Sequence, residues 1–120
     1  MSSYPLPVRV DDVRPGIPLL VPSAGSLSGY AVGELGAVAD AALGRHPWGI
    51  VLDLSGIAAM TPAGLALLVR VAQRAGDLDV GFCIVESGAV RSAVTRAGLQ
   101  QLFELHPGVE EALAALGVAV

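Results

Sequence analysis

The polar side chains that could take part in chemistry gather in two stretches of the chain. Ser26 and Ser28 lie in a small polar loop, while Asp53, Ser55 and Thr61 follow or end a strongly apolar run. A hydroxyl can accept a phosphoryl group, and open α/β sheets usually carry functional groups at the carboxyl ends of their strands. Ser28 and Ser55 also suit ordinary turns. Asp53 fits two roles equally well: a contact or capping acceptor near the Thr61 loop, or an acid bonded to the local backbone.

The dipeptide Thr61-Pro62 predicts the start of a helix. Threonine is a good N-cap residue, and proline is favoured at the first helical position. The cap stabilises the helix by about 1 kcal/mol, and it occupies the hydroxyl of Thr61. We therefore favour capping over phosphate acceptance as the role of Thr61.

No catalytic or metal-binding set follows from the spacing of the remaining polar residues. His46 and His106 are each followed by proline in predicted turns, and no acidic residue is spaced with them as a ligand set. The sequence GSLSG has Leu27 at its centre and fails the G-x-S-x-G test of a nucleophile elbow. Glu110 and Glu111 are adjacent on a predicted helix and point apart. No phosphate-binding G-x-x-x-x-G-K-[ST] loop is present. We expect no cofactor, no metal and no enzymatic activity.

The composition indicates one soluble domain. The chain has 120 residues, of which 53% are hydrophobic and 15% charged, with a formal net charge of -4. It carries no basic stripe, so we do not expect nucleic-acid binding. No apolar run reaches the roughly 18 residues of a membrane span, and the first residues, 1–14, lack the pattern of a signal peptide. We expect a cytoplasmic protein without membrane contact, in which Cys83 is a small core residue rather than a reactive thiol.

The hydrophobic pattern predicts an α/β fold with a mixed, mostly parallel sheet of four to five strands and about four helices, in a single domain spanning residues 1–120. A hairpin around Arg14-Pro15-Gly16 opens the chain within residues 1–22, and a polar loop follows at 23–29. The predicted strands are 8–13, 17–21, 49–54 and 80–85, with a short extended piece around Phe103. The predicted helices are 30–43 with Gly44 as its cap, 62–76 ended by Gly76, 87–97 ended by Gly98, and 109–116.

Residues 48–116 resemble the STAS family of the anti-sigma-factor antagonist type. The resemblance rests on IVLDLSGI, TPAGLALLVRVAQRA, VRSAVTRAGLQQLFELHP and VEEALAAL, in this order and spacing. The N-terminal third fits more loosely: Gly25-Ser26-Leu27-Ser28 stands where many relatives have Gly-Glu-Leu-Asp. The resemblance implies a mixed sheet covered by helices. It also implies binding to a kinase-type anti-sigma factor, which phosphorylates a serine at the start of the helix after the central strand.

The chain departs from the family pattern at that serine. The motif is usually Asp-Ser-Ser-Gly, with the second serine as acceptor. Here Thr61, Pro62, Ala63 and Gly64 stand in its place. Because Ala63 has no hydroxyl, it is a degenerate acceptor position that cannot be phosphorylated. The resemblance implies a partner-binding surface made of Ser26, Ser28, Asp53, Ser55, Met60, Thr61, Pro62, Ala63 and Gly64.

Two classes of function follow from this resemblance. The first is a protein-binding regulator whose partner is an anti-sigma factor or a related switch kinase, and which is not switched by phosphorylation at Ala63. The alternative is a nonenzymatic small-molecule sensor, or a scaffold subunit of a signalling complex, since STAS-like domains are also used in these ways.

Overall fold

A five-stranded sheet organises the domain, and the computed structural model describes residues 8–117 of it. Residues 1–7 of the predicted N-terminal region and residues 118–120 of the predicted domain lie outside this range. The first two strands form the predicted hairpin and are antiparallel, and every other neighbouring pair in the sheet is parallel. The mixed, mostly parallel sheet is thereby confirmed. Its strands in spatial order are β1 (Val8–Arg14), β2 (Ile17–Pro22), β4 (Gly49–Asp53), β6 (Gly81–Val85) and β7 (Leu105–His106).

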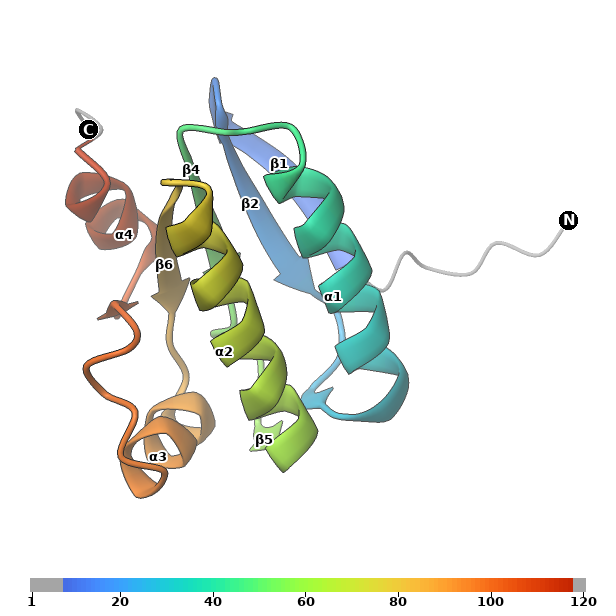
Figure 1. Ribbon diagram of the computed structural model, residues 1–120. Coiled ribbons are helices and arrows are strands. Elements are labelled where there is room, and N and C mark those ends of the chain that lie inside the picture. The colour runs from blue at the N-terminus through green and yellow to red at the C-terminus, as the bar shows by residue number, and fades with distance from the viewer. Residues whose placement is uncertain (1–7, 118–120) are drawn as a thin grey trace, which may run out of the picture.

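Helices cover both faces of this sheet. The long helices α1 (Gly29–Leu43) and α2 (Pro62–Asp77) lie side by side on one face (Figure 1). The short helix α4 (Val109–Ala115) packs against β4 and β6 on the opposite face. Helix α3 (Gly88–Arg96) contacts a short strand, β5 (Ala59–Met60), close to the start of α2. The core is therefore split into two layers by the sheet.

The apolar run of β4 explains why both faces are covered. Successive side chains of a strand point to opposite faces. Ile50 and Leu52 enter the cluster under α1 and α2, whereas Val51 enters the cluster under α4. All three side chains are fully buried. A continuous apolar strand of this kind is stable only when both of its faces are packed.

Several predicted ends differ from the observed ones by one residue, and two differences from the prediction have a clear physical reason. Helix α2 does not end at Gly76 but continues to Asp77, because Gly76 keeps a helical backbone and the turn falls later, at Asp79, whose φ is +58°. The extended piece predicted around Phe103 lies further along the chain, at β7. Phe103 instead places its ring in the core cluster next to α3. Burial of one large aromatic side chain decided its position, rather than strand pairing.

The polar loop predicted at residues 23–29 contains a strand, which the sequence did not indicate. Strand β3 (Ser26–Leu27) pairs in parallel with β5, with Ser26 opposite Ala59 and Leu27 opposite Met60. Two more backbone bonds extend this pairing, since the amides of Ala58 and Ala59 both donate to the carbonyl of Gly25. The pairing joins the chain before α1 to the chain before α2.

No helix within residues 8–117 is both long enough and apolar enough to span a membrane.

Candidate functional site

The first turn of α2 brings together several of the residues singled out in the sequence. Figure 1 shows β5 and the start of α2 at one end of the domain. Because β3 pairs with β5, Ser26 and Ser28 are held beside this end of α2 although they lie more than 30 residues earlier in the chain. The hydroxyls of Ser26 and Ser28 lie 2.9 Å apart and share a hydrogen bond. The structure thus brings the two predicted segments to one place.

Thr61 caps α2 as predicted, and it also ties the helix to β3. Its hydroxyl accepts a hydrogen bond from the amide of Gly64 at 3.1 Å and donates one to the carbonyl of Leu27 at 2.8 Å. The hydroxyl hydrogen is therefore engaged as well as an oxygen lone pair. Pro62 occupies the first helical position, where no backbone donor is required.

Gly64 lies at a close approach of α2 to β3. A Cβ atom built at Gly64 would stand 2.5 Å from the carbonyl oxygen of Leu27 and 2.9 Å from the sulfur of Met60. Real Cβ atoms do not approach so closely, so only glycine fits at this position. Gly64 is also buried, and it supports the surface from below without itself facing solvent.

Ala63 is exposed on the rim of a groove between α1 and α2. The groove has a volume of about 500 Å³ and small side chains on both walls. At its far end, Asp40 of α1 forms ion pairs with Arg70 at 3.7 Å and Arg74 at 3.3 Å. These charges lie away from Ala63, so the groove is neutral where Ala63 stands. The lining residues are Val32, Gly33, Ala37, Asp40, Ala63, Ala66, Leu67 and Arg70.

A second hollow lies on the other side of the first turn of α2. It has a volume of about 360 Å³ and is formed where α2 meets α3. Met60, Thr61 and Pro62 line it from one side, and Ala97 and Arg96 from the other. The first turn of α2 is therefore a ridge between two hollows, with Pro62 and Ala63 exposed on it.

Asp53 and Ser55 form a local turn at the carboxyl end of β4. One carboxylate oxygen of Asp53 accepts hydrogen bonds from the amide of Ser55 at 3.1 Å and from its hydroxyl at 2.6 Å. Of the two roles considered for Asp53, the geometry favours the bond to the local backbone. Ser55 is exposed, so this turn still contributes polar surface at the same end of the sheet.

Tyr30 is a residue of this region that the sequence reading missed. It lies in the first turn of α1, two residues after Ser28, and 76% of its surface is exposed. Its hydroxyl is hydrogen-bonded to Glu34, and this bond, together with the negative charge of Glu34, raises the pKa of the phenol. Exposed tyrosines are enriched in protein interfaces, and this enrichment is the signal that could have drawn attention to it.

The single cysteine is a core residue, as predicted. Cys83 is fully buried, and burial, followed by the negative charge of Glu104, raises its pKa to about 11. The thiol is therefore neutral at physiological pH and a poor nucleophile.

Comparison with known proteins identifies the family. The model of the STAS domain matches residues 9–112, and the chain belongs to this family. No curated protein matches the chain by sequence.

Solved structures with the same fold include anti-sigma factor antagonists. An anti-sigma factor antagonist from Mycobacterium paratuberculosis is 25% identical, with a TM-score of 0.82 over 92% of this chain and 93% of that one. The unphosphorylated form of the anti-sigma factor antagonist SpoIIAA, a Bacillus protein, is 15% identical, with a TM-score of 0.76 over 94% and 99%. The anion transporter SLC26A9 contains a similar fold at 14% identity and a TM-score of 0.73, but only 20% of that chain is covered.

Proposed function

We propose that this domain is a nonenzymatic regulator that binds a kinase-type anti-sigma factor through the ridge at the first turn of α2. The observation that carries the proposal is the exposure of Ala63 on this ridge, between two hollows. Support comes from the anti-sigma factor antagonists among the similar structures. Such a partner acts in the cytoplasm, which agrees with the expected location.

The binding surface combines the ridge with the segments fixed beside it. Pro62 and Ala63 present a small, neutral contact, and two hydroxyls are added by Ser26 of β3 and by Ser28 at the start of α1. Tyr30 supplies an aromatic side chain of the kind that anchors protein interfaces. Asp53 and Ser55 contribute a polar margin at the end of β4, and Met60 and Gly64 support the ridge from beneath.

We further propose that phosphorylation at Ala63 does not switch this domain. A phosphate at a helix N-terminus is tolerated within its own chain, because free amides and the positive end of the helix dipole face it. Its charge acts on the partner instead, through repulsion and lost contacts in a packed interface. Ala63 cannot acquire this charge, and the Thr61 hydroxyl is held between Leu27 and Gly64. The surface therefore stays competent for binding in the presence of ATP.

Affinity capture from the native lysate, with and without ATP, tests the proposal. We expect an anti-sigma factor to be captured equally in both conditions. Ala63→Glu places a fixed charge on the ridge and should weaken binding of the purified partner roughly tenfold or more. Ala114→Glu adds the same charge on α4, on the opposite face of the sheet, and should leave the affinity unchanged.

Several outcomes would overturn the proposal. If no anti-sigma factor is captured, or if Ala114→Glu weakens binding as much as Ala63→Glu, the partner or the surface is wrong. A small molecule retained by the purified protein would then support a sensor, and self-association would support a scaffold. A phosphate found on Thr61 after incubation with the kinase and ATP would contradict its role as an engaged cap.

A further inference from the structure

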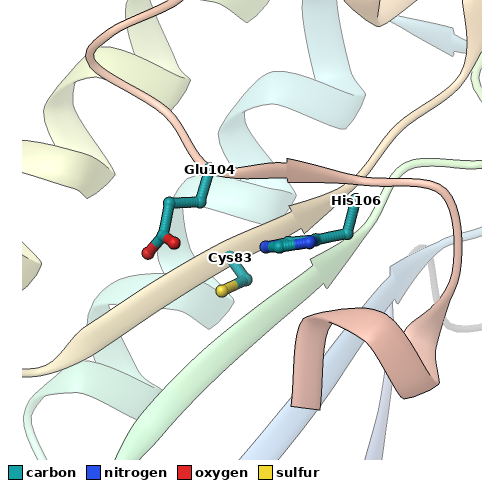
Figure 2. Close-up of side chains that lie close together, drawn as sticks. All are labelled: Cys83, Glu104 and His106. Carbon is teal, nitrogen blue, oxygen red and sulfur yellow. The ribbon is translucent and has the colours of Figure 1, made fainter. Parts of the chain in front are cut away.

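Three side chains able to bind a metal ion meet on the opposite face of the sheet. Three ligand atoms lie within 4.8 Å of one another: the sulfur of Cys83, a carboxylate oxygen of Glu104 and an imidazole nitrogen of His106. Figure 2 shows these side chains close together, with the imidazole of His106 extending from β7 toward Cys83 of β6. They lie under the α4 side of the sheet, so the cluster is separate from the ridge of α2.

The strand register places these residues together. β6 and β7 are parallel, with Ile84 opposite Leu105 and Val85 opposite His106. This register sets Cys83 beside Glu104. Because successive side chains of a strand alternate between faces, Glu104 and His106 share the face of Cys83, whereas Leu105 packs into the other core layer.

His106 carries a polar atom that its surroundings do not satisfy. Its Nε2 atom is buried and has no hydrogen-bond partner in the structure. Buried polar atoms in folded proteins are normally paired, and an orphaned one needs an explanation. The lone pair of a neutral imidazole nitrogen is also a common metal ligand. A metal ion held between His106 and Cys83 would satisfy this atom.

We propose that Cys83, Glu104 and His106 form a binding site for Zn²⁺. Thiolate sulfur, imidazole nitrogen and carboxylate oxygen are the three ligand types that zinc accepts, and a water molecule completes four-coordinate sites with three protein ligands. On binding, the Cys83 thiol gives up its proton to solvent and the sulfur bonds to the metal. Tetrahedral coordination needs ligand atoms roughly 3.5 Å apart, and the exposed side chain of Glu104 can move inward to provide this spacing.

A surface groove borders the cluster at Glu104. The groove has a volume of about 360 Å³, and Glu104 stands on its wall. Asp79 lines the same groove and adds a second carboxylate that attracts cations. Gly81 also lines it, two residues before Cys83 on β6. The groove therefore places two carboxylates beside the proposed site.

A metal ion at this site would stabilise the edge strand β7 of the sheet. β7 has only two residues and lies at the end of the strand order. Besides the two registered pairs, the amides of Ile84 and Glu86 donate to the carbonyls of Glu104 and His106. A metal ion bridging β6 and β7 would add a side-chain link to these backbone bonds.

Titration of the tag-free, reduced protein with Zn²⁺ in a calorimeter, and with Co²⁺ as a spectroscopic probe, tests the site. We expect one ion per chain and a thiolate-to-cobalt charge-transfer band. Cys83→Ala, His106→Asn and Glu104→Gln should each lower the affinity at least roughly tenfold, since loss of an outer-shell partner alone can cost that much. His46→Asn removes the other histidine, which is exposed in a turn, and should leave binding unchanged.

The set of ligand variants still tests the zinc site if one of the variants does not fold. Glu104 is exposed, so Glu104→Gln should fold normally and report on the site if Cys83→Ala does not. The proposal is overturned if the wild type binds no zinc, if the cobalt complex lacks a thiolate band, or if His46→Asn weakens binding as much as His106→Asn. None of these outcomes bears on the ridge of α2, because capture of the anti-sigma factor is measured separately.

Discussion

The hydroxyl of Thr61 offers a sharp test of how the candidate surface is held together. Thr61→Val keeps the shape and branching of the side chain but removes the hydroxyl. The amide of Gly64 then loses its acceptor and the carbonyl of Leu27 loses its donor. Loss of the cap costs about 1 kcal/mol, and an unsatisfied buried carbonyl costs about 1–3 kcal/mol.

The expected loss is smaller than the sum of these two terms. Both hydrogen bonds are only partly buried, so water can replace part of each. We expect Thr61→Val to lower the free energy of unfolding by about 2 kcal/mol. For a domain of this length that corresponds to a decrease in Tm of about 8 °C.

Urea unfolding followed by circular dichroism measures this loss. Thr61→Ser is the matched control because it keeps the hydroxyl, and it should stay within about 1 kcal/mol of the wild type. Helix capping by Thr61 would be refuted if the valine variant lay within about 0.5 kcal/mol of the wild type. Equal losses for valine and serine would show that the methyl group contributes as much as the hydroxyl.

Three further experiments test the packing at Gly64, the ion pairs of Asp40 and the burial of Cys83. Gly64→Ala should destabilise the domain by about 1–3 kcal/mol, because the added Cβ meets the carbonyl of Leu27. Gly76→Ala on the same helix adds a Cβ that meets nothing, and it should stabilise the domain by about 0.5–1 kcal/mol. Equal urea midpoints for the two variants would contradict this contrast. Asp40→Asn removes two exposed ion pairs and should cost under about 1 kcal/mol, with the difference shrinking in high salt; a loss that high salt leaves unchanged would rule out an electrostatic origin. Cys83 should react with a thiol reagent at pH 8 only as fast as the domain opens, since the thiol is buried and its pKa is raised to about 11; rapid labelling of the native protein would disprove this.

Local chemistry made part of the site predictable from the sequence. Thr61-Pro62 predicts the start of a helix by itself, because helix capping by threonine and the missing amide donor of proline depend only on neighbouring residues. The strand at residues 49–53 was equally clear, since a run of buried apolar residues between turn signals has few other uses. These features do not depend on which parts of the chain meet in space.

The other parts of the site could not be predicted from the sequence, because they depend on contacts between distant segments of the chain. β3 and β5 have two residues each, too few to produce a hydrophobic period, and their pairing depends on contacts between distant segments. The groove between α1 and α2 requires the packing of two helices, so Gly33 and Ala37 carried no signal alone. His106 was expected in a turn without an acidic partner, but it lies on β7, and the register that brings Cys83 beside Glu104 depends on strand pairing that the sequence pattern does not give.

The short pairing of β3 with β5 makes the proposed surface discontinuous. Ser26 and Ala63 come from segments that become neighbours only when this pairing forms, so an isolated peptide covering α2 would carry only part of the surface. A partner that recognises both segments binds the folded chain and not the unfolded one. Its binding therefore stabilises the fold by mass action, and the complex resists denaturant better than the free domain. In a destabilised variant, the apparent affinity falls with the fraction of molecules that are folded, even when every contacting side chain is intact.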